Sequence, residues 1–424
     1  MAIDSEKKGL RLFFIPPERY RWFAVLLMWK AHLIYFLIYS SVGVLGPILK
    51  GELKLSNTEF GVLCGAIGVG TTAAQIPGGM WCDRLGVRKV MTLAFVLMAI
   101  CAFIFSMSGG LLFSCFALFF LGLGVGCNQI AAAKAIIDWF PHTGRATAMG
   151  MKQTGINAGG IAGSLALPLL LGLYDWRLLF KLMSALAFLF ALSFSFLYRD
   201  TQNTKQDFSS QPVRFGEVLL SLRETRFLLT TIAGVFLMVA QFSFSSYLVL
   251  YLTQSLHYSL GMSGMILASS FAVGAVARVG WGLASDYLFR GREVALVFIG
   301  GLGIAVGVAL ALLTPATPIW FLYLLSVFFG ISLLGWNGVW ITLAGEVSRE
   351  NSTGLGMGLS FFFANLGLLL GPPLFGFLTD FFHSFFLPWI FLAFCMGMVT
   401  LLLLLGRRTS GWKSAACGLT REIG

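Results

Sequence analysis

Long apolar stretches alternate with short polar segments along most of the chain, from Trp22 to Leu405. Each stretch holds about 20 residues or more, the length that a helix needs to cross a hydrocarbon core of about 30 Å. We therefore predict twelve membrane-spanning helices, at residues 22–48, 57–80, 90–108, 111–137, 146–172, 177–197, 227–252, 262–284, 294–313, 318–344, 354–378 and 385–406. Because a backbone in lipid must satisfy its own hydrogen bonds, this pattern predicts an all-α polytopic membrane protein.

The composition excludes an ordinary soluble globule, because 58% of the residues are hydrophobic and only 11% are charged. The 50 glycines suit helices that pack closely in lipid. The seven cysteines and four histidines are scattered, without the spacing of a disulfide framework, a metal site or a known hydrolase motif. We therefore predict neither an enzyme nor a bound metal or other cofactor.

The formal net charge of +11 reflects the placement of basic residues in loops, and we expect no nucleic-acid partner. With the N-terminus inside, the tails and even-numbered loops carry about 21 Lys and Arg residues, whereas the outer loops carry about 3. This imbalance predicts a multi-pass inner-membrane protein with both termini in the cytoplasm. The polar tail of about 20 residues before Trp22 predicts a first helix that is not cleaved.

An internal repeat appears when the segment around the fifth predicted span is laid on the segment around the eleventh at an offset of 208 residues. The first copy carries Asp138, Gly150, Asn157, Gly159 and Gly163, and the second carries Glu346, Gly358, Asn365, Gly367 and Gly371 at matching positions. Because two asparagines match in the same register, duplication explains the pattern better than abundant glycine does. We predict two homologous halves, 1–198 and 226–424, joined by a polar cytoplasmic linker at 199–225.

The loop between the second and third predicted spans reads GGMWCDRLGVRK, which resembles the signature of the major facilitator superfamily. The residues that carry the resemblance are Gly79, Asp83, Arg84, Gly86, Arg88 and Lys89. The corresponding loop of the second half has a weaker copy, with Gly282 and Asp286. The resemblance covers essentially the whole chain. It implies two pseudo-symmetric six-helix bundles, a monomer, and secondary transport by alternating access.

The signature has two interpretations. A carboxylate at a turn near the membrane surface can pair with basic residues and with the positive end of a helix in the other half, so the motif can act as a gate latch. Alternatively, its basic residues only fix the topology, although acidic residues such as Asp83 contribute little to orientation. The chain lacks two family patterns, an Arg near Leu118 in the fourth span and a Gly-Pro pair in the fifth, which disfavours a drug/proton antiporter.

Basic residues inside the predicted spans point to the substrate. These residues are Lys30, Lys134, Lys152, Lys181 and Arg278, and no Asp or Glu lies near the centre of a span. Lys134 and Lys181 lie near span ends, where a lysine can extend to the interface. Because an unpaired charge in lipid is costly, we expect Arg278, Lys30 and Lys152 to bind an anionic substrate. An Arg before a GxxSD turn in the eighth span also resembles organic-anion and nitrate- or cyanate-type carriers.

Polar and aromatic residues near these charges complete the predicted site. The further substrate-binding candidates are Gln129, Gln153, Asn157, Gln241, Trp336, Asn337 and Asn365. Asn157 and Asn365 equally suit hydrogen bonds between helices, and Trp336 equally suits an anchor against lipid. His32 is the leading candidate for proton coupling because imidazole titrates near neutral pH, with Asp138 and Glu346 behind it. A histidine bonded to a neighbouring helix is the alternative.

These observations predict a secondary transporter that imports or exchanges a small carboxylated anion, with protons as the coupling ion. The partners would be this small molecule and the lipid bilayer. One alternative is export of a drug, siderophore or metabolite. Another is a transporter-like sensor that binds a ligand without moving it, although the short tails leave little chain to carry a signal.

Overall fold

The computed structural model describes residues 16–140, 144–201, 224–289, 291–348 and 353–409, and its ordered elements are helical. The first half contains α1 (Pro17–Val44), α2 (Gly46–Glu52), α3 (Asn57–Leu85), α4 (Val87–Ser106), α5 (Leu111–Trp139), α6 (Arg145–Leu171) and α7 (Trp176–Leu197). The second half contains α9 (Thr225–Gln254), α10 (Leu260–Leu283), η2 (Ala284–Leu288), α11 (Arg292–Leu312), α12 (Ile319–Phe329), η3 (Gly330–Leu334), α13 (Asn337–Glu346), α14 (Thr353–Phe382) and α15 (Phe386–Thr409). Most of the predicted linker 199–225 and both tails lie outside the described residues.

The described chain contains 12 helical segments that are long and apolar enough to cross a membrane, which confirms the twelve predicted spans. Their ends differ from the prediction by a few residues; α3, for example, continues to Leu85. The predicted span at 318–344 is confirmed as Ile319–Glu346, but the helix within it is interrupted. This segment is divided into α12, a π-helical turn η3 and α13, with Gly335 and Trp336 between the last two.

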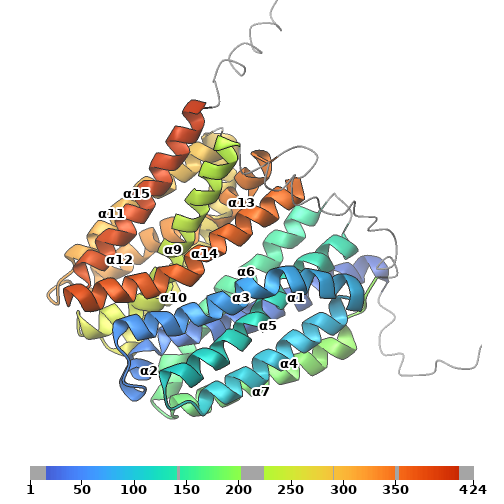
Figure 1. The fold of residues 1–424 in the computed structure, drawn as a ribbon, viewed down its shortest axis with the longest axis horizontal. Coiled ribbons are helices and arrows are strands. Elements are labelled where there is room, and N and C mark those ends of the chain that lie inside the picture. The colour runs from blue at the N-terminus through green and yellow to red at the C-terminus, as the bar shows by residue number, and fades with distance from the viewer. Residues whose placement is uncertain (1–15, 141–143, 202–223, 290, 349–352, 410–424) are drawn as a thin grey trace, which may run out of the picture.

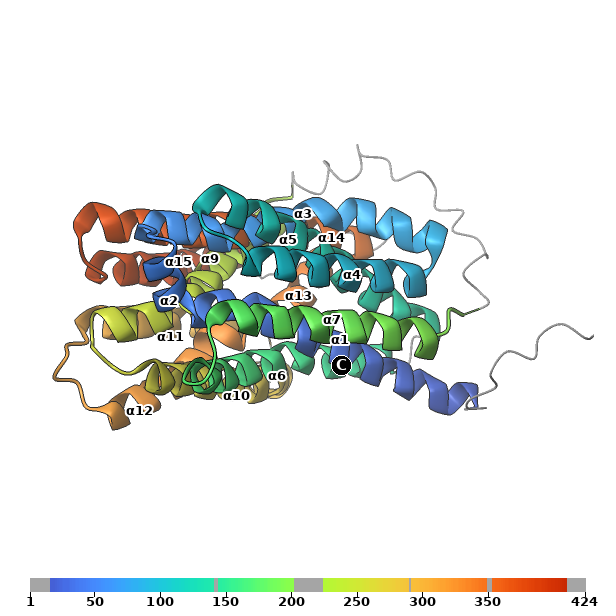
Figure 2. The ribbon, with the colours of Figure 1, turned by 90° about the horizontal axis from the view of Figure 1, so that it is seen from below.

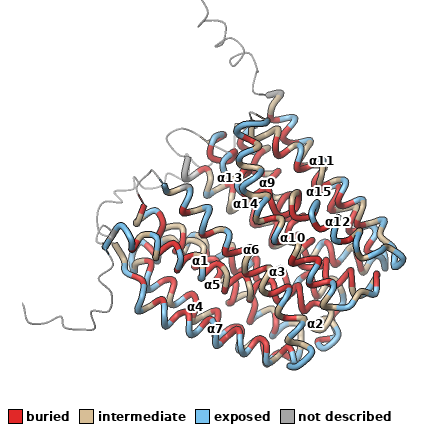
Figure 3. Tube along the Cα trace, turned by 180° about the vertical axis from the view of Figure 1, so that it is seen from behind, coloured by how far each residue is buried: buried red, intermediate tan, exposed pale blue. Residues whose placement is uncertain are grey.

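The helices form two bundles with equivalent internal contacts, α1 to α7 in the first and α9 to α15 in the second (Figures 1 and 2). In the first bundle α1 packs on α6 and α4 on α7; in the second α9 packs on α14 and α11 on α15. Buried positions follow the helix faces that meet, and exposed positions lie on the outside (Figure 3). Many of the exposed residues are large and apolar. This pattern suits a protein whose outer surface contacts lipid.

The two bundles meet along α3 with α14, α6 with α10, and α1 with α9. Glycines allow these helices to touch: a Cβ on Gly61 would lie 2.3 Å from the Pro372 carbonyl oxygen, and one on Gly264 would lie 2.3 Å from that of Ser164. These contacts lie on the parts of the helices farther from the chain termini. Figure 1 shows the bundles diverging toward the termini. We call the joined end, opposite the termini, the closed end.

Glycines also hold the first bundle together, where α3 crosses α5. A Cβ on Gly70 would lie 2.0 Å from the Phe119 carbonyl oxygen, and one on Gly122 would lie 2.2 Å from the Ile67 carbonyl oxygen. Backbone atoms cannot move aside as a flexible side chain can, so any larger residue must push the helices apart. The two helices can therefore pack at this distance only with glycine at these positions.

We expect Gly122→Ala to lower the stability of the protein by about 1–3 kcal/mol, because the added methyl group overpacks the contact with Ile67. The change should appear as a lower thermal unfolding midpoint in detergent. The matched control is Gly301→Ala in α11, where a Cβ has nothing within 4 Å. Equal midpoints for the two variants would contradict this account of the packing.

Candidate functional site

Lys152 on α6 and His32 on α1 lie side by side inside the first bundle. Lys152 is only 6% exposed, and Gly155, three residues later, brings α6 against the backbone of Trp29. A Cβ on Gly155 would also lie 2.9 Å from the Cβ of His32, so Lys152, one turn earlier on α6, is held near the imidazole. His32 is also buried, and its Nδ1 lies 2.9 Å from the Met28 carbonyl oxygen, to which it can only donate. Among the described residues, no carboxylate lies within ion-pair distance of Lys152.

Arg278 on α10 supplies a second cation from the other bundle. Its Nε donates to the Leu334 carbonyl oxygen at 3.0 Å. One terminal guanidinium nitrogen, Nη1, is buried without a hydrogen-bond partner. In the part of the chain that the structure describes, Arg278 also has no carboxylate within ion-pair distance. Donors of this kind remain available to a ligand.

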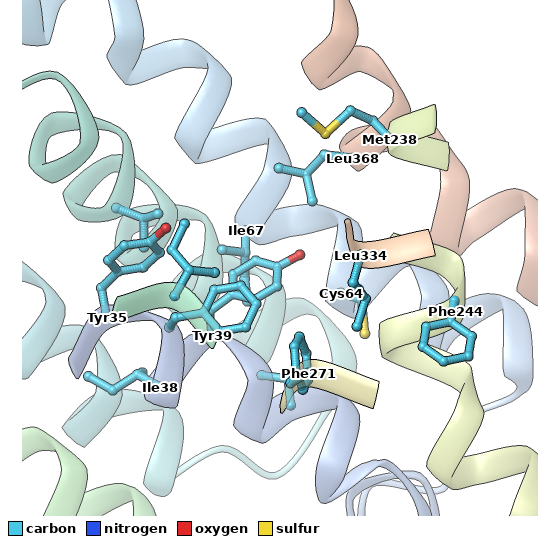
Figure 4. Packing of buried hydrophobic residues seen from close by; sticks show 14 of the residues in the cluster. Tyr35, Ile38, Tyr39, Cys64, Ile67, Met238, Phe244, Phe271, Leu334 and Leu368 are labelled. Atoms are coloured by element: carbon cyan, nitrogen blue, oxygen red, sulfur yellow. The ribbon is translucent and has the colours of Figure 1, made fainter. Parts of the chain in front are cut away.

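Tyr35 on α1 links the two bundles at this level. It is 2% exposed, and its hydroxyl interacts with the Gln129 side chain on α5 and with the charge of Arg278. Figure 4 shows Tyr35 and Tyr39 among apolar side chains from both bundles, including Ile67 and Phe271. Tyr35 was not among the sequence candidates. The sequence could have pointed to Tyr35 through its spacing of three residues from His32, which places both residues on one side of α1.

Gln129, Arg278 and Lys152 lie at similar depths along their helices. At a rise of about 1.5 Å per residue, Gln129 lies about 15 Å from the end of α5, and Arg278 lies about 15 Å from the end of η2. Lys152 lies about 10 Å from the start of α6. All three distances are measured from the end of the protein that carries the termini. We define Lys152, His32, Tyr35, Gln129 and Arg278 as the central cluster.

The two repeat asparagines occupy equivalent places between the bundles. Asn157 is 1% exposed and lies on the same side of α6 as Gly160, which packs against Phe271 of α10. Asn365 is 3% exposed and lies on the same side of α14 as Leu368, which packs against α3. Neither side-chain nitrogen has a partner in the described structure, nor does the Asn157 side-chain oxygen. Both amides can therefore bind a polar ligand or water.

The remaining substrate-binding candidates from the sequence lie within the second bundle or on the face of α6 toward α10. The Asn337 amide donates to Gln241 at 3.0 Å, which joins α13 to α9. Trp336 is fully buried in the core, and its indole donates to the Leu333 carbonyl oxygen at 3.2 Å. Gln153 is half-buried, one turn before Asn157 on the side of α6 that faces α10.

Lys30 does not join the central cluster. It is exposed, and the nine residues that separate it from Tyr39 correspond to about 180° around α1 at 100° per residue. Tyr39 faces Phe242 of the other bundle, so Lys30 projects toward the outside of the protein. Leu26, one turn earlier on the same side, is exposed as well.

The acidic residues of the signature form ion pairs within their own bundles. Asp83 lies 2.9 Å from Lys134 of α5, and Asp138 is half-buried near the same lysine. In the second bundle, Arg292 pairs with Asp286 at 3.4 Å and with Glu346. The other charged signature residues, Arg84, Arg88 and Lys89, are exposed at the same end of the protein. In this conformation, neither Asp83 nor Asp286 has an ion pair with a described residue of the opposite bundle.

Two glycines of the signature differ in their surroundings. Gly86 has φ +83°, and a Cβ there would lie 2.8 Å from the carboxylate of Asp200. That carboxylate accepts the Arg88 amide at 3.1 Å and so caps the start of α4. Gly86 therefore has a structural role. Gly79 and its counterpart Gly282 have no atom closer than 3.9 Å to such a Cβ.

Side chains of α10 stabilise the interruption between α12 and α13. A π-helical turn does not keep the regular pattern of hydrogen bonds, so carbonyl groups need other donors. The Ile331 carbonyl oxygen accepts from Trp281 Nε1 at 2.8 Å, and the Leu334 carbonyl oxygen accepts from Arg278 Nε at 3.0 Å. The central cluster is thus attached directly to the interrupted helix.

Twelve segments long and apolar enough to span a membrane, in two bundles with a cation from each near their contact, are typical of a multi-pass secondary transporter. The chain belongs to the major facilitator superfamily, whose family model matches residues 28–372. The family is one of transporters and not of enzymes, as predicted.

Characterised and inferred transporters resemble the chain over most of its length. The hexuronate transporter of Bacillus subtilis is 23% identical, over 84% of this chain and 87% of that protein. The probable galactarate/D-glucarate transporter GarP of Escherichia coli K12 is 24% identical, over 96% and 97% respectively. The probable sulfoacetate transporter SauU of Cupriavidus necator is 22% identical, over 86% and 90%.

Solved structures support the fold. A bacterial homologue of the human lysosomal transporter Spinster, in an inward-facing and occupied conformation, superposes with a TM-score of 0.78 at 17% identity, covering 92% of this chain and 97% of that one. A D-xylose-proton symporter superposes with a TM-score of 0.73 at 16% identity, covering 91% and 97%. These similarities confirm the two-bundle architecture.

We expect Trp281→Phe to lower the stability of the protein by about 1–3 kcal/mol, because it leaves the Ile331 carbonyl group without its donor. The ring contacts with Phe289 and Phe298 can be kept by phenylalanine. The thermal unfolding midpoint in detergent measures the effect. Trp320→Phe is the control, since Trp320 is 65% exposed. A Trp281→Phe midpoint as high as that of the control would show that the bond contributes nothing to stability.

Proposed function

We propose that this transporter carries a small organic anion, which binds between Lys152 and Arg278. The observation that supports the proposal most directly is that a buried Lys152 in one bundle and a half-buried Arg278 in the other lie at similar depth without a carboxylate partner among the described residues. Charges buried in this way are costly unless something compensates them. An anion bound between the bundles would supply that compensation in each transport cycle.

The surrounding polar groups favour a carboxylate that also carries hydroxyl groups. The planar guanidinium group of Arg278 suits carboxylates and other planar or tetrahedral oxyanions. Gln129, Gln153, Asn157 and Asn365 offer amides that can bind hydroxyl groups, and Gln241 with Asn337 would form a more distant wall. The names of the relatives, which include hexuronate, galactarate and sulfoacetate transporters, agree with an anionic substrate. The proposed site omits Lys30, which projects outward, and Trp336, which is in the core.

The direction in which the bundles diverge suggests the conformation. If both termini are cytoplasmic, the closed end faces outward and the structure is inward-facing. The substrate would then reach the central cluster from the cytoplasmic side in this state. The ion pairs of Asp83 and Asp286 within their own bundles agree with a signature latch that is released in this state and would form again in the outward-facing one.

We expect Arg278→Gln and Lys152→Gln each to weaken binding of the substrate by at least about 30-fold. Loss of one partner of a buried charge pair costs about 2–5 kcal/mol, and each 1.4 kcal/mol is about a factor of ten in affinity. Uptake of labelled glucuronate, galactarate and sulfoacetate into proteoliposomes, together with ligand-induced thermal stabilisation, measures the effect.

The matched control is Lys30→Gln, which removes the same charge from a lysine on the outside of α1. It should leave affinity within a few-fold of the unchanged protein. Transport of a neutral or cationic solute, or full affinity for an anion in Arg278→Gln, would refute the anion site. Binding without flux under any imposed gradient would instead support the sensor hypothesis.

We further propose that His32 couples transport to protons. Because Nδ1 donates to the Met28 carbonyl group, Nε2 is the nitrogen that can take up a proton. Lys152 opposes a second positive charge beside it, whereas a bound anion would favour one. Proton uptake and anion binding would therefore support each other, which is the requirement for symport. Asp138 and Glu346 lie in the ion-pair regions at the helix ends and are weaker candidates.

We expect His32→Gln to abolish accumulation of the anion against its concentration gradient when a proton gradient directed into the vesicles is imposed. Exchange of anion for anion should continue. Parallel accumulation and counterflow assays in proteoliposomes distinguish the two processes. His257→Gln, at an exposed loop histidine, should keep both activities. Undiminished pH-driven accumulation in His32→Gln would rule out this role for the imidazole.

A further inference from the structure

A carboxylate from the second bundle joins the two bundles at the closed end. Asp380, in the last turn of α14, accepts four hydrogen bonds from the start of α3. Its Oδ1 accepts the Asn57 backbone amide at 3.0 Å and the Asn57 side-chain amide at 2.7 Å. Its Oδ2 accepts the Thr58 backbone amide and the Thr58 hydroxyl, both at 2.6 Å. These bonds connect residues that are more than 300 positions apart.

The start of α3 is suited to receive this carboxylate. The first N–H groups of a helix lack partners within it and form the positive end of the helix dipole. Ser56 and Glu59 form a capping box, in which Ser56 accepts the Glu59 amide and Glu59 accepts the Ser56 amide. The capping box leaves the amides of Asn57 and Thr58 free, and these are the two backbone donors that Asp380 uses.

Other side chains reinforce the same junction. The Tyr247 hydroxyl of α9 donates to the Asn57 carbonyl oxygen at 2.6 Å. Lys50 Nζ of α2 donates to the Asn57 side-chain oxygen at 2.6 Å and to Gln254 of α9 at 3.3 Å. Gly376 permits this approach, since a Cβ there would lie 2.2 Å from the Asn57 carbonyl oxygen. Asn57 is thus bound on all its polar groups by elements of both bundles.

We propose that Asp380 is the latch of the closed end and that it sets the balance between the two access states of the transporter. When this end opens, α14 must leave α3, and all four hydrogen bonds of the carboxylate must be exchanged for bonds to water. Asp380 is fifteen residues beyond Asn365, which corresponds to about 22 Å along α14. It therefore acts on the conformational equilibrium as a positioning residue and does not touch the substrate.

The native Cys64 provides a reporter for this equilibrium. It is a free, buried thiol on α3, beside Tyr39, Ser245 and Ser246 in a small cavity between the bundles. Opening of the closed end would expose it to water. In a protein whose other six cysteines are replaced by serine, the rate of reaction of Cys64 with a membrane-impermeant thiol reagent then measures the open population.

We expect Asp380→Asn to increase the reaction rate of Cys64 at least about tenfold in lipid nanodiscs, because an amide cannot accept all four bonds. Thr58→Ala, which removes one donor, should cause a smaller increase. Asp175→Asn is the matched control: Asp175 lies at the start of α7 and its carboxylate pairs with Arg177 in its own bundle. It should leave the rate unchanged.

A second reporter separates a shift in equilibrium from general loosening. In a cysteine-free background, Ala133→Cys places a thiol one turn beyond Gln129, nearer the termini. If Asp380→Asn shifts the protein toward the other access state, reactivity at this position should fall while that of Cys64 rises. A rise at both positions, an unchanged Cys64 rate in Asp380→Asn and Thr58→Ala, or an equal rise in Asp175→Asn would each overturn the proposal. None of these outcomes depends on the identity of the substrate.

Discussion

The positive charges of Lys152 and Arg278 are the constraint around which the centre of the protein is organised. A cation in a low-dielectric interior must find dipoles or an anion, and the structure provides only part of the compensation. Arg278 binds the Leu334 carbonyl group, which is available because the helix there is interrupted, and it faces the hydroxyl of Tyr35. One guanidinium nitrogen remains unpaired. The interruption at η3 thus supplies one acceptor to Arg278, and the rest of its charge still needs compensation.

The protein uses buried polar groups in two opposite ways. At the closed end, the polar groups of Asp380 and Asn57 are all hydrogen-bonded, to one another and to Thr58, Tyr247 and Lys50, which favours one conformation over others. At the centre, Asn157 and Arg278 keep unpaired hydrogen-bonding groups. A site that binds and releases a ligand must keep hydrogen-bonding groups unpaired when it is empty. A contact that holds a conformation must have its hydrogen-bonding groups paired. In the proposed function, the separation of the two along the helices would allow binding and gating to be tuned independently.

The sequence predicts those features that depend on position along a helix, and it fails for those that depend on rotation about it. Hydropathy located the twelve spans of the described chain, and the cost of charges in lipid identified Lys152 and Arg278 as cations that face the interior. Lys30 also lies well inside its predicted span, but the packing of α1 on α6 turns its side chain outward. No local sequence pattern reveals this orientation. The helix interruption after Phe329 contains no proline that would predict it from the sequence. It depends on hydrogen-bond donors from α10. Asp380 lies near the end of a span, where an acidic residue resembles an ordinary surface group until α3 is seen opposite it.

The departures from internal symmetry are as informative as the repeat itself. Asn157 and Asn365 keep their equivalence because α6 with α10 and α14 with α3 are equivalent contacts between the bundles. The position that matches Lys152 at an offset of 208 is Ser360, which is buried and bonded to Thr231 within its own bundle. A fully symmetric protein would carry matching cations in both halves. One substrate bound on the pseudo-symmetry axis would need an asymmetric site. In the proposed function, the two similar halves would supply the alternation of access, and residues unique to each half would supply the recognition.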